Sequence, residues 1–269
     1  SGHAFASLGA AVAGASGVLG TSDLYTNNYQ LNIPCYYDSG ADTLVVSVSG
    51  YTAGPNNYIR IYTPVSTTSE ANRSQRHQGK WDDGKYRMSY SNRNGDFFAV
   101  KVPYTVIEGL QIKTTYTVAG GGSEKLISVS VAGALSEVRI ISNILTPVVL
   151  TALDFSLRGI YVTNSVITQK TYVFDNILYN FKNGFSRGYA IDAAGSNGYI
   201  YVYNNTAYDC NIGFAGGTWT KNVVKNNIAQ NCDVGFSGTF NVASNNNISD
   251  LDATAPGANS KQATVSFAD

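Results

Sequence analysis

Short strand-like runs, in which apolar and polar or aromatic positions alternate, recur along most of the chain. In YIYVY (199–203), for example, Ile200 and Val202 share one face and the three tyrosines share the other. Such a period of two predicts a strand that buries one face against a core. The strands predicted in this way are 43–50, 57–64, 97–102, 105–113, 171–174 and 199–203.

The strand-like runs belong to an internal repeat. NNTAYDCNIGF at 204–214 returns one unit later as NNIAQNCDVGF at 226–236. An asparagine anchors each unit, and Gly109 is assigned to the same column further upstream. Because Asn and Gly tolerate the left-handed conformation, this column predicts a bend in every unit. The anchors, whose spacing shortens along the chain, are Asn143, Asn176, Asn205, Asn227 and Asn247.

A second column pairs a glycine with a large apolar residue. Short units of roughly 20 residues or more, each with short strands and a bend, predict a single-stranded right-handed parallel β-helix. A leucine-rich repeat would need a Leu consensus that is absent, and propeller blades are longer. The stacked asparagines should bond to each other along the axis, as amide ladders do. The second column comprises Gly159-Ile160, Gly184-Phe185, Gly213-Phe214 and Gly235-Phe236.

We predict one all-β domain over residues 1–269, with caps at both ends. Residues 1–40 form the N-terminal cap, with a short helix within 5–19, and residues 251–269 form the C-terminal cap. The polar segment 69–96 interrupts the repeat, and we interpret it as an excursion loop or a hairpin. Regular coils then occupy 97–250.

The composition narrows the classes of partner. Hydrophobic residues make up 43% of the 269 residues and charged residues only 13%, with 18 basic and 18 acidic side chains. This balance favours neither nucleic acid nor an anionic membrane as a partner, and no apolar run reaches membrane-spanning length. Cys35, Cys210 and Cys232 fit neither a disulfide framework nor a metal motif. Cys210 and Cys232 lie one coil apart, and we expect two buried thiols in preference to a disulfide between them. We expect no cofactor and no metal.

Several phrases resemble a known group of proteins. They are YIRIYTP, RHQGKWDDGKYRM, YTVIEGLQI, YNNTAYDC, KNNIAQNC and NISDLDATAPG, spread from about residue 43 to 268. They are similar to right-handed β-helix proteins of the pectate-lyase-like superfold, and more narrowly to a group found in phage and bacterial genomes. The resemblance implies a β-helix that is often encoded near phage structural genes, and it carries no established chemistry.

Catalytic chemistry has few candidates. His77 could serve in a Ser-His-Asp arrangement, or it could simply pack in the excursion with Trp81 as its anchor. Many β-helix enzymes use carboxylates for acid–base work, but Asp175 and Asp209 fall in bend columns beside Asn and Ser. The least explained carboxylate is Asp192. The strongest catalytic hypothesis combines Asp192 and Arg187 with Asp154 and Arg158 one coil earlier, against the simpler interpretation as surface turn charges.

An aromatic patch is the alternative site. The spacing between the second and third anchors places Tyr172 on Tyr201 and Phe174 on Tyr203, all facing outward. Such a patch suits a sugar ring or a protein partner, although stacked aromatics can also serve only to stabilise the sheet. The same columns hold Arg139 and Ile141 one coil earlier, and Val223 and Lys225 one coil later.

These observations favour a non-enzymatic structural or adhesive protein of a virion surface or of the extracellular space. We expect the partner to be a glycan or a protein subunit of a larger particle, and we expect a homo-oligomer. A polysaccharide lyase or glycoside hydrolase of the β-helix type is the rival hypothesis. A purely architectural subunit, whose aromatic patch is buried in an assembly, is the third. Fold alone does not choose among them.

Overall fold

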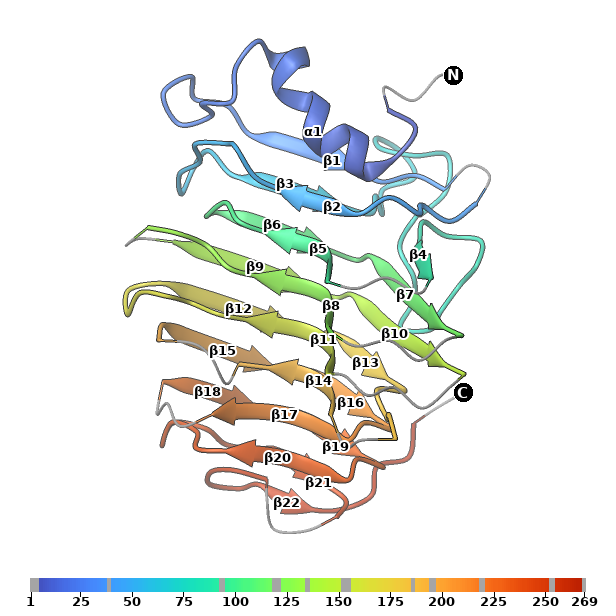
Figure 1. Cartoon of the computed structure of the whole chain (residues 1–269), viewed down its shortest axis with the longest axis vertical. Coiled ribbons are helices and arrows are strands. Elements are labelled where there is room, and N and C mark those ends of the chain that lie inside the picture. The colour runs from blue at the N-terminus through green and yellow to red at the C-terminus, as the bar shows by residue number, and fades with distance from the viewer. Residues whose placement is uncertain are drawn as a thin grey trace.

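The structure is a computed structural model that describes residues 5–37, 40–91, 95–117, 122–133, 136–150, 156–184, 187–193, 197–217, 221–251 and 255–267. The described chain winds into a parallel β-helix, whose coils stack along one long axis (Figure 1). Each full coil contributes one strand to each of three parallel sheets. The predicted all-β solenoid with a short N-terminal helix is therefore confirmed.

The three sheets are named by their order along a coil. The first sheet contains β1 (Leu31–Pro34), β3 (Ile59–Tyr62), β6 (Thr105–Glu108), β9 (Glu137–Ile141), β12 (Lys170–Phe174), β15 (Tyr199–Tyr203) and β18 (Asn222–Lys225). The second contains β4 (Met88–Ser91), β7 (Gln111–Tyr116), β10 (Ile144–Val149), β13 (Ile177–Tyr179), β16 (Thr206–Tyr208), β19 (Ile228–Gln230), β21 (Ile248–Ser249) and β22 (Lys261–Gln262). The third contains β2 (Val46–Val48), β5 (Asp96–Val100), β8 (Ser123–Val129), β11 (Ser156–Val162), β14 (Gly188–Asp192), β17 (Ile212–Gly217) and β20 (Val234–Gly238).

The core consists of apolar columns that run along the axis. Parallel, in-register pairing places like residues above each other, so β-branched side chains stack on the inner face. Each member of the longest column is at most 8% exposed. From β1 to β18 this column is Ile33, Ile61, Ile107, Ile140, Val173, Val202 and Val224.

The anchor asparagines form a continuous hydrogen-bonded ladder between the first and second sheets. The Nδ2 atom of Asn143 donates to Oδ1 of Asn176 at 3.0 Å, and the same bond repeats along the ladder at 2.9, 3.1 and 3.1 Å. Each Oδ1 also accepts the backbone N–H of the anchor, or its equivalent, in the previous coil. The side chains are at most 1% exposed, so the ladder satisfies polar groups inside the core.

The bend itself lies one residue earlier than the sequence suggested. The left-handed residues are Gly109, Ser142, Asp175, Asn204, Asn226 and Asn246, with φ between 54° and 75°. Gly109 therefore aligns with Ser142, and Leu110 aligns with Asn143. The assignment of Gly109 to the anchor column is wrong. The left-handed residue turns the chain at the surface of the core. The asparagine that follows it can then direct its side-chain amide into the core.

The glycine column also needs one correction. The register aligns Ile160, Ile191, Phe214 and Phe236 in the third sheet, so Ala190 takes the place assigned to Gly184. Small residues precede these apolar residues because a neighbouring carbonyl lies close. A Cβ at Gly159 would lie 2.6 Å from the carbonyl oxygen of Ala190, and one at Gly213 would lie 2.6 Å from that of Gly235.

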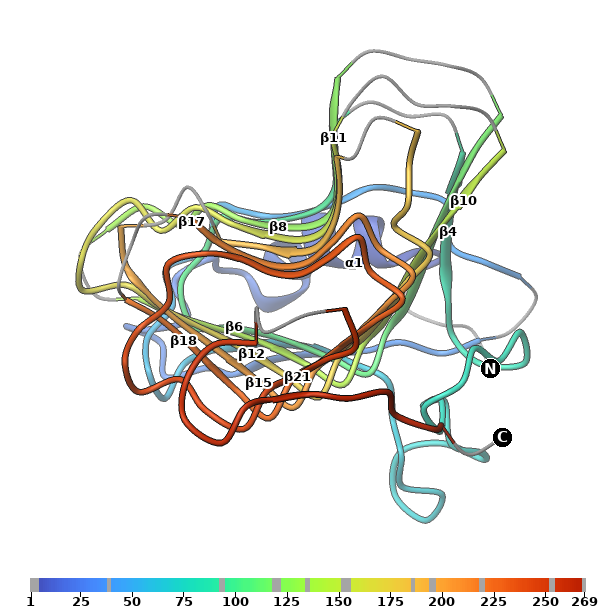
Figure 2. The same ribbon diagram turned by 90° about the horizontal axis from the view of Figure 1, so that it is seen from below.

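The coils shorten toward the C-terminus, which explains the falling repeat spacing. In Figure 2 the far ends of β4, β7 and β10 and the beginnings of the following third-sheet strands extend sideways from the cross-section. The coils from β16 onward lack this side extension and are more compact (Figure 2). The second-sheet strands shrink accordingly, from six residues in β10 to three in β13.

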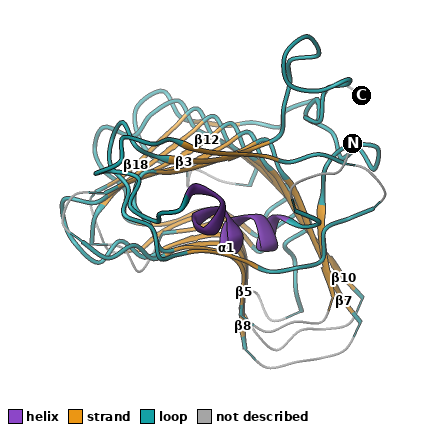
Figure 3. Cartoon of the chain, turned by 90° about the horizontal axis from the view of Figure 1, so that it is seen from above, coloured by secondary structure: helices purple, strands orange, loops and turns teal. Residues whose placement is uncertain are grey.

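Both predicted end segments contain strands of the solenoid. Helix α1 (Leu8–Leu19) lies across the N-terminal end of the core (Figure 3). The predicted cap 1–40 also contains β1, which pairs with β3, so the first sheet begins earlier than expected. The segment 69–96 has no hairpin among its described residues: it is irregular up to residue 87, and β4 then pairs in parallel with β7.

Candidate functional site

The aromatic patch lies on the outer face of the first sheet. The register pairs Tyr172 with Tyr201 and Phe174 with Tyr203, as their spacing suggested. The flanking residues also match, because Arg139 and Ile141 pair with β12 and Val223 and Lys225 pair with β15. Tyr199, at the start of β15, adds a fifth ring that is 36% exposed.

The rings form two stacks along the axis. The ring centroids of Tyr172 and Tyr201 are 4.9 Å apart with an interplanar angle of 13°. Phe174 and Tyr203 are 5.5 Å apart at 19°. Cations lie near both ends of the patch, since the guanidinium of Arg139 is 6.0 Å from the Tyr172 centroid and the ammonium of Lys225 is 6.0 Å from that of Tyr203.

This geometry changes what the patch can bind. The sequence suggested flat aromatic faces open to a ligand, but in each stack the two rings cover one face of each other. Their outer edges and, for the tyrosines, their hydroxyl groups remain for a partner, and the four rings are half-buried. Burial raises the pKa of Tyr172 and of Tyr203, so both hydroxyls stay protonated at neutral pH and can donate as well as accept.

A hollow of about 320 Å³ continues the patch toward the N-terminal end of the same sheet. Two ion pairs lie in it: Arg60 with Glu108 at 2.8 Å and Arg139 with Glu137 at 2.6 Å. Arg139 lies at the boundary, because it lines the hollow and also approaches the Tyr172 ring. The surface therefore combines paired donors and acceptors at one end with tyrosine hydroxyls at the other.

Glu108 is the most constrained charge of this surface. Arg60 donates to its Oε2 through Nε and Nη2, at 3.0 and 2.8 Å, and Arg76 from the excursion donates to Oε1 at 2.7 Å. Burial alone would raise the pKa of Glu108, but the two guanidinium groups outweigh burial and lower it. The Cζ atom of Arg60 also lies 4.0 Å from the centroid of Tyr62, and burial together with the hydrogen bond to Glu70 raises the pKa of Tyr62 to about 12.

Sequence reasoning missed the hollow because of the one-residue error at Gly109. Aligning Gly109 with Asn143 implies a spacing of 34 residues between these coils. Subtracting 34 from the outward positions Arg139 and Ile141 gives Thr105 and Ile107, which face inward. The observed register leads instead to Val106 and Glu108, which face outward. A shift of one residue exchanges the two faces of a strand. Aligning Gly109 with Ser142 by its need for a left-handed residue would have found the site.

The structure rearranges the catalytic hypothesis around Asp192. This carboxylate is 3% exposed and pairs with Arg158, whose Nε lies 2.5 Å from Oδ2. Arg187 does not supply the counterion, since its side chain is exposed and, within the described part of the chain, it bonds only through its backbone. Arg158 also bonds to Ser123 and lies over the rings of Tyr161 and Tyr189. Asp154 lies outside the described residues.

His77 has a structural position. Its Nδ1 accepts the N–H of Gly79 at 3.1 Å, so its Nε2 carries the proton and donates to the carbonyl oxygen of Ser142 at 2.8 Å. Burial lowers the pKa of His77, which keeps the ring neutral at pH 7. With both nitrogens engaged to backbone groups, the ring anchors the excursion to the bend column and has no free nitrogen for a triad.

The remaining candidates also have structural positions. Asp175 and Asp209 take the left-handed conformation at 57° and 55°, which places them in bends as expected. The three cysteines are free and buried, and burial raises the pKa of Cys35 and Cys210. Within the described part of the chain, no group of three or more His, Cys, Asp or Glu residues could hold a metal. No helix in that part is long and apolar enough to cross a membrane.

The chain was compared with protein-family models, with curated proteins and with solved structures. It matches none of them. The function must therefore be argued from the geometry of the chain itself.

Proposed function

We propose that the protein is a rigid, non-enzymatic surface protein of the pectate-lyase-like β-helix type, of a phage particle or the extracellular space. In this proposal it binds glycan along the outer face of its first sheet. One observation carries the proposal: half-buried aromatic stacks on β12 and β15 continue into a hollow that holds two arginine–carboxylate pairs. An extended ligand parallel to the axis would contact both.

The chemistry of this face favours a hydroxyl-rich, uncharged ligand. Each carboxylate of the hollow is paired with an arginine, and Arg76, which also pairs with Glu108, adds one further cation, so the net charge of this surface is small and gives a polyion little long-range attraction. Carboxylate oxygens accept hydrogen bonds and guanidinium groups donate them, while tyrosine hydroxyls do both. Sugar hydroxyls likewise donate and accept. A few fixed polar groups on a preformed surface are what gives a ligand site its specificity.

The geometry gives less support to the rival hypothesis of a polysaccharide lyase or hydrolase. Acid–base cleavage of a glycosidic bond commonly uses two carboxyl groups that flank the bond. Asp192 is buried against Arg158, and it lies on the third sheet, away from the aromatic patch. The carboxylate of Asp96, on strand β5 of the same sheet, is itself paired with Lys125 at 2.6 Å.

A glycan array tests the proposal with two double variants. Tyr172→Ala with Tyr201→Ala removes rings and hydroxyls, whereas Tyr172→Phe with Tyr201→Phe removes only the hydroxyls and keeps the stack. We expect both to weaken glycan binding more than about tenfold, or about 1.4 kcal/mol. Because a stacked pair contributes about 0.5–1.5 kcal/mol, we expect only the alanine pair to lower the melting temperature, by a few degrees.

Tyr208→Ala provides the matched control, since Tyr208 is 40% exposed but lies on the second sheet. It should bind glycan as the wild type does. If the phenylalanine pair binds normally and the alanine pair does not, the rings and not the hydroxyls recognise the glycan; if both pairs bind normally, the stack only stabilises the sheet. Depolymerisation of any polysaccharide that is lost in Asp192→Asn would replace the proposal with the enzymatic hypothesis.

A further inference from the structure

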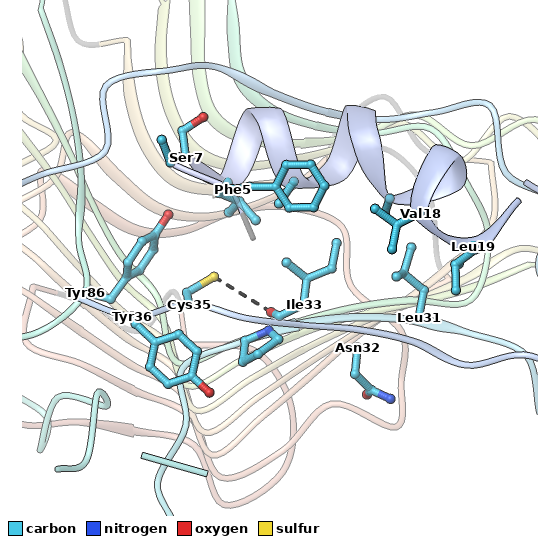
Figure 4. A pocket seen from close by; sticks show the side chains of 15 residues that line it. Phe5, Ser7, Val18, Leu19, Leu31, Asn32, Ile33, Cys35, Tyr36 and Tyr86 are labelled. Carbon is cyan, nitrogen blue, oxygen red and sulfur yellow. Dashed lines mark hydrogen bonds between the residues drawn. The ribbon is translucent and has the colours of Figure 1, made fainter. Parts of the chain in front are cut away.

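We propose that the N-terminal end of the solenoid holds a second binding site, a pocket for a small, uncharged, apolar molecule. A hollow of about 390 Å³ lies between helix α1 and strand β1. Figure 4 shows this space, with the helix on one side and the β1 side chains Leu31, Ile33 and Cys35 on the other. The pocket lies at the opposite end from the shortest coils, and it does not depend on the glycan-binding proposal.

The pocket exists because small residues of the helix face large residues of the strand. Ala11 and Ala15 lie one turn apart on the buried face of α1 and are 9% and 6% exposed. Leu31 and Ile33, each 8% exposed, face them from β1. Two alanines cannot fill the distance between a helix and a strand, so the core stays open there. Pockets of about 300–1,000 Å³ with mostly apolar walls are typical of small-molecule sites.

Phe5 closes one side of the pocket. A Cβ placed on Gly14 would lie 2.6 Å from Cε1 of Phe5, which shows how closely the ring packs on the helix. Figure 4 also shows Tyr86 and Cys35 at one end and Val18, Leu19 and Leu31 at the other. The walls therefore offer apolar surface along the whole length of the hollow.

The polar groups at the Tyr86 end are already engaged, which disfavours an anionic ligand. The N–H of Leu8 donates to Oδ2 of Asp42 at 2.6 Å, and the Tyr86 hydroxyl donates to the same oxygen at 3.2 Å. Asp42 thus occupies the helix N-terminus, where an anionic ligand would otherwise bind, and its charge repels one. Burial and the charge of Asp42 raise the pKa of the Cys35 thiol, which therefore remains neutral.

The strand edge disfavours a peptide as the occupant. β1 is the outer strand of the first sheet, and the N–H groups of Leu31 and Cys35 donate to carbonyl groups of the β3 side. The alternating residues Asn32 and Pro34 therefore direct their backbone groups to the free edge. Proline has no N–H, so an added strand would find a single donor on β1. A compact apolar molecule needs no such donors.

The test uses two fluorescent probes that differ mainly in one sulfonate. N-phenyl-1-naphthylamine is neutral and apolar, and 1-anilinonaphthalene-8-sulfonate is anionic. We expect the full chain to bind the neutral probe saturably, at one probe per chain, and to bind the anionic probe at least about tenfold more weakly, or about 1.4 kcal/mol. Ala15→Phe should fill the pocket and abolish saturable binding, and Ala11→Leu should weaken it while keeping the fold.

Ala13→Phe is the matched control, because Ala13 is on the same helix but exposed. It should bind the neutral probe as the wild type does. Three results would overturn the proposal: no saturable binding to the wild type, equal binding to the Ala15→Phe and Ala11→Leu variants, or tighter binding of the anionic probe. A change in molecular mass in these variants, without a change in probe binding, would show instead that a second copy covers the pocket.

Discussion

At the scale of single residues, the asparagine ladder shows how a buried polar side chain can specify a coil. Asn227 donates through Nδ2 to Val202 O at 2.8 Å and to Asn247 Oδ1 at 3.1 Å, and it accepts from both nitrogens of Asn205. Every contact joins neighbouring coils. A coil with the wrong length would break them, so the ladder fixes the register that the apolar columns alone would leave free.

We predict that Asn227→Ala destabilises the protein by about 1–3 kcal/mol, because it leaves buried polar groups of two coils without partners. Equilibrium denaturation followed by circular dichroism measures the change. Asn56→Ala is the matched control, because Asn56 is exposed and its backbone carbonyl, which the substitution keeps, accepts a hydrogen bond from Gln30. Equal stability of the Asn227→Ala variant and the control would contradict a structural role for the ladder.

The sequence identified the ladder but not the residue that bends the chain. Three of the five anchors follow another asparagine, at 204–205, 226–227 and 246–247, and either member could take the left-handed conformation. Ser142 and Asp175 resolve the ambiguity, since at those units only the second residue is an asparagine. The spacing of the units could therefore be predicted from the sequence. Which residue of each unit takes the left-handed conformation could be predicted only by comparing all the units.

At the scale of elements, the excursion before β4 is docked by polar contacts. Arg76 bonds to Glu108 and Thr63, Gln111 accepts from the N–H of Asp82, and His77 bonds to Ser142. Lys113 lies 4.7 Å from the Trp81 ring. The sequence predicted that this segment interrupts the repeat. It could not predict where the segment packs, because these contacts join residues without any periodic spacing.

We predict that this docking weakens in acid through His77. Burial lowers the pKa of His77 in the folded protein, so between its ordinary value near 6.5 and the lowered value the unfolded chain binds more protons. The contribution of His77 to stability is therefore complete above about pH 6.5 and falls as the pH drops through this window. Stability measured from pH 7.5 to 5 should decline more steeply for the wild type than for His77→Gln.

His3→Gln serves as the comparison, because it removes the only other histidine. Its pH profile should follow the wild type, and hydrogen exchange at pH 5 should show faster opening of residues 64–87 in both proteins. Parallel profiles for wild type and His77→Gln would mean that the imidazole does not titrate in the docked excursion.

At the scale of the whole molecule, both ends of the solenoid are blunted and its sides are weakly charged. Helix α1 covers one end, Pro34 removes a donor from the β1 edge, and the short strand β22 closes the second sheet at the other end (Figure 1). End-to-end growth is therefore disfavoured. With charged residues at only 13% of the chain, broad lateral faces lack strong hydration.

We therefore predict side-by-side self-association or attachment to a larger particle. Sedimentation velocity over a hundredfold concentration range should show a species heavier than the 28.7 kDa monomer.

The variant Tyr172→Ala with Tyr201→Ala locates the contact, and Tyr208→Ala again serves as the control. If only the double variant dissociates, the aromatic patch is a subunit interface, and the architectural hypothesis displaces glycan binding. If association persists in both, another lateral face carries it and the patch remains available to glycan. A monomer at every concentration, from a source that contains no larger particle, would contradict the prediction.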